Sequence, residues 1–448
     1  MVYKKIYNWS RTNSSYALVE YPKKYKEISD IIKKNNNKKS ISMIASGGSY
    51  GDCFLNDNGV IIDINNLNKI IKLDKKSNTV LVQCGVKIQD LLNFLMPKGY
   101  YLNCIPGFNE ATVGGCINSN VHGKDAHFKG VFGNNVVNLK AMNSQGKIMN
   151  INKSSNKFLY AIGFYGLTYV VLEATLKVNK IQSSLLQVNT IKFSNYSNLF
   201  ELFKKYEKKK YIFMGAWVNH FNISGSGIFK AAKWHNQKNN NFKKINIFSS
   251  FLKKLIVNFF YPPLRIFFVN RVVIKFLNLM LFNLTKNSNK KQDFADFYFP
   301  QQKYLPEESK LYKNGKVNIQ ILIPEKKVLK VLSEINRLCK ENKMESWWFG
   351  IKKHKKDKFI LSYSLNGYDI TLQWSKHYTY RRNFDFFYKS LIKLIVKNKC
   401  LIYLTQDILL NKKDFKEIFK DQLRFKRNKL KIEPRNLFKN NFYKRLFD

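Results

Sequence analysis

The stretch that decides the fold runs from Pro106 to Gly133 and reads PGFNEATVGGCINSNVHGKDAHFKGVFG. It contains paired glycines, several small or polar side chains, and the tripeptide His122-Gly123-Lys124. Glycine permits positive φ and lets a backbone approach a ligand closely. The pattern therefore indicates main chain packed against something flat and large, and it matches no simple helix or strand.

A second glycine-rich stretch, ASGGSYGD, lies upstream at residues 45–52. It follows an expected strand, and a turn of this kind can direct several N–H groups toward one anion. Together the two stretches suggest a pyrophosphate cradle and a wall for a planar ring. Two glycine-rich surface loops fit the same spacing equally well, so the residues alone leave both interpretations open.

Both stretches resemble the FAD-binding domain of the vanillyl-alcohol-oxidase (PCMH-type) flavoprotein family, and within it the branch of decaprenylphosphoryl-ribose oxidases. Shorter similarities extend this resemblance nearly end to end, most weakly in the middle of the chain. They are Trp9-Ser10-Arg11-Thr12, Gly166-Leu167-Thr168, Gln320-Ile321-Leu322-Ile323-Pro324, Glu433-Pro434 with Phe438, and Lys444-Arg445-Leu446.

The resemblance implies an α+β fold with two domains, and apolar periodicity places the elements. We expect helices over 22–35, 88–96, 158–164, 195–206, 328–342, 384–398 and 413–419. We expect strands over 38–44, 60–64, 70–73, 79–84, 136–143, 147–151, 169–178, 185–193, 211–219, 225–233, 317–323, 344–350, 359–364, 368–374 and 401–403.

The expected helices and strands fall into three segments of the chain. A PCMH-type FAD-binding domain is expected over 1–182, and an antiparallel sheet backed by helices, as the substrate-binding domain, over 183–425. Residues 426–448 are expected to return to the FAD domain. An apolar, basic insert over 242–288 interrupts the second domain.

The formal net charge of the 448 residues is +48, which is extreme. Lysines are scattered along the whole chain, as in a general drift of composition, and no zinc pattern, RNP motif or basic helical repeat supports a nucleic-acid-binding protein. Such a surface should still attract anionic lipids or phosphate-bearing substrates.

The six cysteines have no metal-binding spacing and predict free thiols in a reducing compartment. We expect no signal peptide, because the first ten residues lack an apolar core, and no apolar run is long enough to span a bilayer. The predicted location is the cytoplasm, with a peripheral position at the inner membrane face as an extension of that prediction.

The resemblance implies FAD as the cofactor. Covalent members of the family carry a His in a Gly-His-Ser context in the first glycine-rich turn, whereas here Gly48 directly precedes Ser49, so we expect non-covalent FAD. The expected cofactor-binding residues are Gly47, Gly48, Ser49, Tyr50, Gly51, Asp52, Pro106, Gly107, Thr112, Gly114, Gly115, Cys116, Asn118, Val121, His122, Gly123, Gly166 and Val170.

Oxidation of a secondary alcohol needs a hydride acceptor and a base for the hydroxyl proton. The resemblance implies catalytic roles for Lys124, Lys352, Gln320 and Gln406, and no metal. Gln406 occupies the position of a family lysine that contacts flavin and substrate, and it cannot carry that charge. Either Lys124 or Lys352 supplies the charge, or the substrate has changed. A lone histidine such as His122 is more often structural, and single lysines are weak evidence in so lysine-rich a chain.

Trp217, Asn318, Asp369 and Thr371 are the expected substrate-contacting residues. Asn318 and Gln320 alternate on one strand, so both can face the same cavity. Trp217 fits a core aromatic residue equally well. Thr371 occupies the position of a cysteine in the mycobacterial relative, which removes a soft nucleophile and spares the chemistry.

These features predict an FAD-dependent oxidoreductase acting on a sugar hydroxyl, with a polyprenylphosphoryl ribose oxidised at its 2'-hydroxyl as the first half of an epimerisation. A short-chain NADH-dependent reductase is the partner that the resemblance implies. The alternatives are an aldonolactone or sugar-alcohol oxidase of the same fold, similar to D-arabinono-1,4-lactone oxidase, and a flavin-binding protein without turnover.

The insert concentrates Phe and Leu with lysines in two runs, 251–260 and 271–282, separated by Pro262-Pro263. Both are too short and too charged to span a bilayer. Their composition is typical of helices that lie in a membrane interface. An ordinary lid packed on the substrate domain is the alternative.

Overall fold

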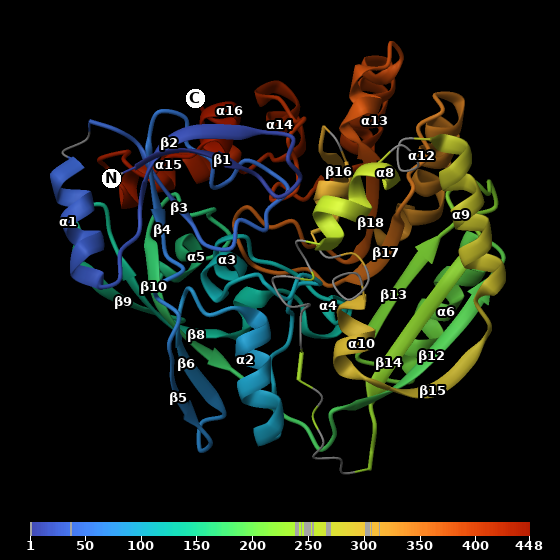
Figure 1. Cartoon of the computed structure of the whole chain (residues 1–448), viewed down its shortest axis with the longest axis horizontal. Helices are drawn as coiled ribbons and strands as arrows, with labels where there is room; N and C mark the ends of the chain where they lie inside the picture. Colours follow the sequence, from blue (N-terminus) through green and yellow to red (C-terminus); the bar gives the residue numbers. More distant parts are fainter. Residues whose placement is uncertain are drawn as a thin grey trace.

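The computed structural model describes residues 2–35, 38–237, 242, 244–245, 252, 255–265, 270–300, 305, 307–312 and 314–448. It confirms the predicted α+β class, because helices with one mixed and one antiparallel sheet in the first part of the chain are followed by one large antiparallel sheet. The two parts lie side by side, and the C-terminal helices, red in Figure 1, lie over the first part.

The first region, residues 2–182, contains a four-stranded sheet in the order β1-β2-β4-β3 and a five-stranded sheet in the order β5-β6-β10-β8-β9. The predicted hairpins β5–β6 and β8–β9 are both present. The bounds are β1 Val2–Tyr7, β2 Ser14–Glu20, α1 Tyr25–Asn35, β3 Ile41–Ile44, β4 Val60–Asp63, β5 Ile70–Asp74, β6 Thr79–Gln83, α2 Ile88–Leu95, β7 Tyr100–Tyr101, α3 Val113–Asn118, α4 Ala126–Lys129, β8 Val136–Met142, β9 Ile148–Asn152, α5 Phe158–Ala161, β10 Val170–Lys177 and β11 Asn179–Lys180.

The second region is built on an eight-stranded antiparallel sheet in the order β15-β12-β14-β13-β17-β18-β16-β19. The remaining elements have these bounds: β12 Leu185–Phe193, α6 Tyr196–Lys208, β13 Phe213–Val218, β14 Gly227–Trp234, α8 Tyr261–Leu264, α9 Arg271–Leu284, β15 Ser288–Asp293, α10 Phe294–Tyr298, β16 Lys316–Pro324, α12 Val328–Glu341, β17 Phe349–His354, β18 Gly367–Ser375, α13 Phe384–Asn398, β19 Leu401–Ile402, α14 Lys412–Ile418, α15 Gln422–Ile432 and α16 Asn441–Leu446.

Alternation along the central strands separates a core face from a polar face. In β16 the side chains of Ile319, Ile321 and Ile323 join the core under α6, α12 and α13, while Asn318 and Gln320 take the opposite face because successive side chains alternate. Strand β18 repeats the pattern with Asp369, Thr371 and Gln373. Strands β16 and β18, together with β17 beside β18, therefore present a row of polar groups toward the first region.

The stretch 106–133, whose pattern matches no simple helix or strand, contains the short helices α3 and α4, and α3 carries the paired glycines. Thr112 begins this helix by accepting a hydrogen bond from the Gly115 N–H at 3.2 Å. A Cβ at Gly114 would lie 2.9 Å from the Cβ of Cys84. The glycines thus serve close packing of a short helix against a neighbouring chain segment.

Two predicted strands are also wrong. Residues 359–364 form a turn and loop, in which Asp357 and Ser362 accept hydrogen bonds from the N–H groups of Phe359 and Ser364. Side-chain acceptors of this kind compete with strand pairing. The strand expected over 344–350 begins at Phe349 instead and continues to His354.

The C-terminal segment contacts the first region through the backbone. The Ile41 N–H donates to the Leu437 carbonyl at 2.9 Å, and the Lys439 N–H donates to the Ile41 carbonyl at 3.1 Å. Helices α15 and α16, which the sequence analysis did not predict, flank the residues that meet the start of β3 at Ile41. The tail therefore lies beside the first glycine-rich stretch.

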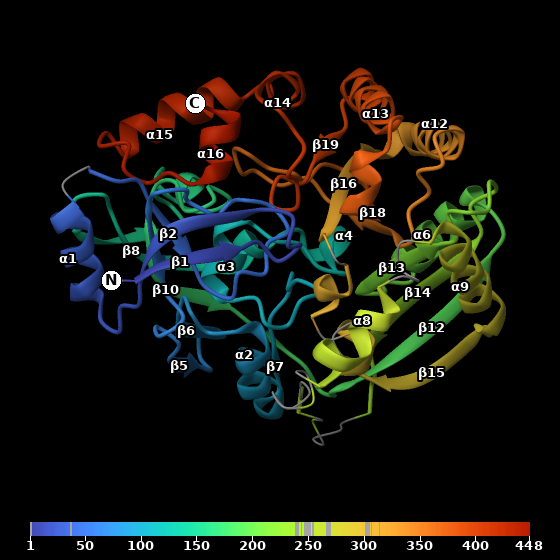
Figure 2. The ribbon, with the colours of Figure 1, turned by 45° about the horizontal axis from the view of Figure 1, so that its top comes forward.

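The apolar, basic insert contains α8 and α9, and much of its first half, including most of 246–254, lies outside the described residues. A π-helical turn over 256–260 precedes α8. Figures 1 and 2 place α9 on the side of the molecule remote from α1. No helix in the described ranges is long and apolar enough to cross a membrane.

Candidate active site

A cavity of about 340 Å³ lies between the two regions. Its lining combines both glycine-rich stretches with strands β16 to β18 and with residues 403–406. Of the predicted site residues it is lined by Gly47, Gly48, Ser49, Tyr50, Pro106, Gly107, Thr112, Gly115, Cys116, Asn118, Val121, His122, Gly166, Gln320, Lys352, Thr371 and Gln406. Its volume falls within the range of small-molecule sites.

Backbone forms one wall of this cavity. Gly47 has φ +61°, and within the described ranges no acceptor is found for the N–H groups of residues 46–50. A run of free N–H groups around a left-handed residue is the geometry of an anion nest. The first glycine-rich stretch therefore fits a diphosphate.

The two glycine-rich stretches touch at Gly48. A Cβ there would lie 2.6 Å from the ring of Phe108, whereas a Cβ at Gly107 would meet nothing within 4 Å. The Phe108 ring also contacts Trp9, at 4.7 Å between centroids. Gly48 thus serves contact between the stretches, and Gly107 borders open space where a ligand can approach.

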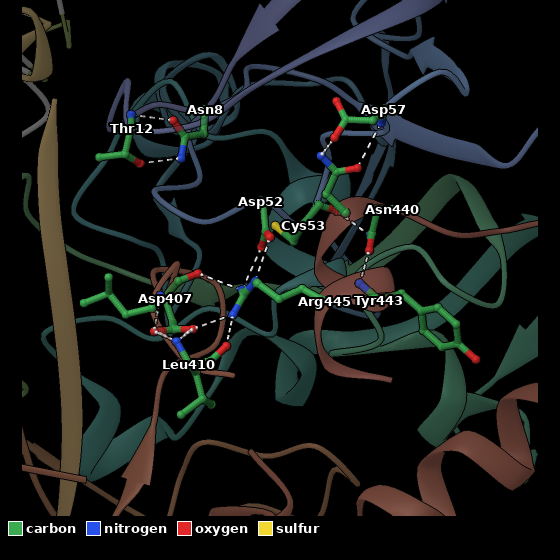
Figure 3. A network of polar contacts seen from close by, with 12 residues as sticks. Asn8, Thr12, Asp52, Cys53, Asp57, Asp407, Leu410, Asn440, Tyr443 and Arg445 are labelled. Atoms are coloured by element: carbon green, nitrogen blue, oxygen red, sulfur yellow. Dashed lines mark hydrogen bonds and ion pairs between the residues drawn. The ribbon is translucent and has the colours of Figure 1, made fainter. Parts of the chain in front are cut away.

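Arg445 fixes the backbone wall from behind (Figure 3). Its guanidinium donates two hydrogen bonds of 2.9 Å to the carboxylate of Asp52 and a third, of 3.1 Å, to Asp407. Burial alone would lower the pKa of Arg445, but the two carboxylates outweigh it and raise that pKa. We call these three residues the Arg445 clamp. It joins the glycine-rich turn to the segment that carries Gln406.

The same segment also contacts the turn directly. Gly51 donates its N–H to the Thr405 carbonyl at 2.9 Å, and the Ser49 hydroxyl donates to that same oxygen at 2.5 Å. A Cβ at Gly51 would lie 2.8 Å from the carbonyl oxygens of Thr405 and Asp407. Gln406 is therefore held at the cavity by contacts on both sides of it, and its Oε1 accepts a hydrogen bond from Asn318.

Side chains form the opposite wall, around Lys352. The Lys352 ammonium lies 3.2 Å from Oδ2 of Asp369 and 3.2 Å from Nδ1 of His122. Gln320 donates to Asp369 at 2.5 Å and lies 3.3 Å from Nε2 of His122. Lys352 is the only Lys or Arg found in the described part of the cavity lining. We call Lys352, His122, Gln320 and Asp369 the polar wall.

Burial and neighbouring charge set the protonation of the polar wall. Burial, then the charge of Lys352 and the neighbouring His354, hold the pKa of His122 well below its usual value. Burial alone would raise the pKa of Asp369, but Lys352, His354 and His122 outweigh it and lower that pKa. At neutral pH the His122 imidazole is therefore neutral and Asp369 is a carboxylate.

His354, His122 and Asp369 form one group whose potential metal-ligand atoms lie within 4.8 Å of one another. Nε2 of His354 is 3.4 Å from Oδ2 of Asp369. The Lys352 ammonium already contacts two members of this group at 3.2 Å. A positive charge in that position opposes a second cation, so the group is better described as the Lys352–Asp369 ion pair flanked by His122 and His354.

The backbone wall lies in a part of the chain that matches a known protein family. Residues 16–152 match the family described as FAD binding domain. This part of the chain is an FAD-binding domain. The free N–H groups at the turn and the cavity beside them fit that cofactor. The outer limits expected for the domain, residues 1 and 182, stay predictions.

The chain is also similar to curated proteins. Decaprenylphosphoryl-beta-D-ribose oxidase of Mycolicibacterium smegmatis is 30% identical over 186 residues, 40% of each chain. Mitochondrial D-lactate dehydrogenase (cytochrome) of Kluyveromyces lactis is 30% identical over 208 residues, 42% of this chain and 34% of that protein. L-gulonolactone oxidase of Mus musculus is 26% identical over 317 residues, 66% of this chain and 69% of that protein. The matches span less than half the length of the first two relatives.

Lys124 lies outside the cavity lining, although it is close in sequence to His122 of the FAD-binding domain. Its ammonium donates to the carbonyl of Tyr298 in α10 at 2.6 Å and lies 4.3 Å from the ring centroid of that residue. Burial, then the charges of Lys352 and Lys230, lower its pKa to about 7. The structure thus separates the two lysines that the sequence left as alternatives.

Other predicted site residues also lie outside the lining. Asp52 belongs to the Arg445 clamp, Asp369 to the polar wall, and Asn318 supports Gln406. Trp217 is buried in β13, and Val170 is buried in the core of the first region. The remaining predicted residues that do not line the cavity are Gly51, Gly114 and Gly123.

Several lining residues were missed by sequence reasoning. Trp9 and Phe108 flank the glycine-rich turn, and Tyr403 donates a hydrogen bond to the Ser119 carbonyl at 3.3 Å. Glu308 lines the cavity while paired with buried Lys316 at 2.7 Å. Phe108 lies within residues 106–133, and its position beside Gly107 could have identified it as a cavity residue from the sequence. No sequence signal identified Glu308 as a cavity residue.

Proposed function

We propose that the protein is an FAD-dependent oxidoreductase that oxidises a secondary alcohol of a sugar, the 2'-hydroxyl of a polyprenylphosphoryl ribose, as the first half of an epimerisation. One observation carries the proposal: an FAD-binding domain offers free backbone N–H groups to a cavity whose opposite wall holds one lysine beside a neutral histidine. The similarity to the mycobacterial oxidase supports this choice of substrate.

Bound FAD supplies a hydride acceptor. The residues of the polar wall then have separable roles. The His122 imidazole is neutral at pH 7 because its pKa is lowered, so it can accept the hydroxyl proton. The Lys352 ammonium, 3.2 Å from that imidazole, stabilises negative charge developing on the substrate oxygen. Asp369 holds Lys352 in place through their contact of 3.2 Å.

The amide pair at Gln406 and Asn318 changes the charge of the site. Neither amide carries a charge, and the described lining contains Lys352 as its lysine. The charge expected from a lysine at position 406 therefore falls to Lys352 alone in this proposal. If Lys352 alone cannot supply this charge, the protein is instead a catalytically altered flavoprotein.

A second candidate is an aldonolactone or sugar-alcohol oxidase of the same fold. The observation in its favour is the match to L-gulonolactone oxidase, which covers 66% of this chain and so continues beyond the FAD-binding domain. A soluble lactone would need no contact with lipid. Under the first proposal, by contrast, a short-chain NADH-dependent reductase would return the hydride and complete the epimerisation.

The deciding experiment is anaerobic flavin reduction by the purified, FAD-loaded protein, followed by absorbance. A short-chain polyprenylphosphoryl ribose is compared with L-gulono-1,4-lactone and with D-arabinono-1,4-lactone. Bleaching by the ribosyl lipid supports the first proposal, and bleaching by a lactone alone replaces it with the second. Flavin that stays oxidised with all three compounds contradicts both.

We propose that FAD is bound without a covalent link. His122 is the one histidine in the described lining, and Ser49 occupies the turn where covalent relatives carry theirs. Acid precipitation should leave all the flavin in the supernatant. Yellow flavin retained in the washed pellet would contradict this proposal.

A further inference from the structure

The insert exposes an unusual number of large apolar side chains. Phe259 is 73% exposed, Val272 73%, Phe276 58% and Leu284 73%. The other exposed apolar residues of these segments are Phe260, Leu264, Leu277, Leu279, Met280 and Leu281. Large exposed apolar side chains gathered on one part of a soluble protein mark sites of interaction. We call this set the α8–α9 surface.

Helix α9 is fixed with this side outward. Of its fourteen residues Ile274 and Asn278 are buried. The Asn278 side chain donates to the Trp347 carbonyl at 3.3 Å, and Arg271 donates from Nε to Glu345 at 2.8 Å. These contacts use the polar and charged groups of α9 to attach it to the protein. The apolar residues are therefore left on the outer side by the way the helix is anchored.

The charge that the insert itself contributes to this surface is of one sign. The sequence contains no Asp or Glu between Glu207 and Asp293. Lys275 is exposed in the middle of α9, and Lys290 and Lys291 are exposed on β15. The ammonium of Lys192 lies 4.3 Å from the ring centroid of Phe282. The α8–α9 surface thus combines aromatic and aliphatic side chains with a basic surround.

The same surface connects to the cavity through a small apolar cluster. Val257 and Tyr261, in the π-helical turn and α8, pack with Leu311 and Tyr312, and Leu305 packs against the same cluster. Leu305 also lines the cavity. The exposed residues Phe259 and Phe260 therefore belong to the same short segment as side chains that share a cluster with a cavity-lining residue.

We propose that the α8–α9 surface binds the interface of a membrane rich in anionic lipids. Exposed apolar side chains would enter the boundary between headgroups and acyl chains, while the lysines contact the headgroups. A second copy of this chain is disfavoured as the occupant, because each copy carries a net charge of +48 and has no acidic residue in this part of its sequence. The proposal does not depend on which substrate the cavity takes.

The test is flotation of the FAD-loaded full-length protein with vesicles of phosphatidylglycerol and phosphatidylcholine in equal parts, and with phosphatidylcholine alone. The variant V272S/F276S/L284S removes three side chains of the surface. L329S/F386S/L423S is the matched control, because these residues are 46%, 67% and 63% exposed on α12, α13 and α15. Circular dichroism and flavin content establish that both variants are folded.

We expect wild type and control to float with the anionic vesicles at low salt, and the surface variant to show at least a tenfold lower ratio of bound to free protein. Binding should weaken as salt rises, because the basic surround contributes to it. Equal flotation of the two variants would overturn the proposal. So would wild-type protein that stays at the bottom of the gradient.

A labelled variant shows whether a membrane or a second copy of this chain binds the α8–α9 surface. All six native cysteines are buried, so a thiol-reactive fluorophore would select Cys in Phe276→Cys, with Phe386→Cys as the control. The label at 276 should shift to shorter wavelength on addition of anionic vesicles, and the label at 386 should not. A shift at 276 that follows protein concentration without vesicles would instead indicate self-association and contradict the proposal.

Discussion

The two walls of the cavity differ in the protein groups that form them. The wall in the FAD-binding domain is mainly backbone, with free N–H groups at residues 46–50 and glycines that admit close approach. The polar wall consists of side chains whose charges depend on one another, with Lys352, His122 and Asp369 in mutual contact. A backbone wall can be altered by adding volume, and a side-chain wall by removing charge. Substitutions should therefore separate cofactor binding from chemistry.

Arg445→Leu should have the largest effect and should act on the backbone wall. It would leave the buried carboxylates of Asp52 and Asp407 without their shared cation. Breaking a buried pair from one side typically destabilises by about 3–5 kcal/mol. We expect a lower melting temperature together with loss of bound flavin, measured by thermal unfolding and absorbance. A variant that keeps its flavin and its melting temperature would contradict this stabilising role of the Arg445 clamp.

Lys352→Met should act on the polar wall alone. It leaves the glycine-rich turn intact, so flavin content should be unchanged. Loss of a positioned charge at the site of proton transfer should slow flavin reduction on the order of a hundredfold. Lys353→Met is the matched control, because that neighbour pairs with Glu207 at 2.6 Å, away from the cavity. Similar rates in the two variants would contradict the role of Lys352.

Gly48→Ala and Gly107→Ala test how closely the backbone wall is packed. The added methyl would lie 2.6 Å from Phe108 in the first variant and would meet no protein atom within 4 Å in the second. Overpacking of this kind costs about 1–3 kcal/mol, so flavin affinity should fall roughly tenfold or more in Gly48→Ala. If Gly107→Ala alone weakens flavin binding, the cofactor itself lies against Gly107. Titration of apoprotein with FAD measures both.

Acid should weaken the polar wall before the backbone wall. The pKa of His122 in this wall is held well below its usual value, with burial as the largest cause, and burial also lowers the pKa of its neighbour His354. The unfolded chain therefore takes up protons near pH 6.5 that the folded chain does not. Stability present above pH 6.5 should decline below it, on the order of 1 kcal/mol per pH unit for each histidine. Melting temperatures from pH 7.5 to 4.5 should decline less steeply in His354→Asn.

Lys124→Met should have the smallest effect on chemistry. Its ammonium contacts Tyr298 and not the cavity. Flavin reduction should stay within a few-fold of wild type at pH 7, where Lys124 is only partly protonated because its pKa is lowered to about 7. A hundredfold loss with flavin retained would return Lys124 to the site and contradict the separation of the two lysines.

Local features of the site were predictable from sequence and long-range pairings were not. Glycine-rich turns act through their own backbone, so Gly47, Gly48 and Gly107 could be recognised as cavity residues without a partner. The bounds of α13 were likewise predicted, because helical periodicity is local. The position of Lys124 was not predictable, since two residues after His122 the chain has turned toward α10.

Pairs from distant parts of the chain account for most of what the sequence did not show. Arg445 meets Asp52 across 393 positions, and Asn318 meets Gln406 across 88. His354 attracted no attention in sequence, because its importance comes from β17 lying next to β18, which carries Asp369. The strand expected over 359–364 was wrong for the opposite reason, since nearby side-chain acceptors overrode an apolar pattern.

The Arg445 clamp has a consequence for biosynthesis. Asp52 in the glycine-rich turn leaves the ribosome 393 residues before Arg445, which anchors it. Domains generally begin to fold as they emerge during synthesis. Here the cofactor cradle reaches its final form only after nearly 400 further residues have been translated. We therefore expect flavin capture to be a late event, and a nascent chain released before Arg445 should have an unanchored cradle.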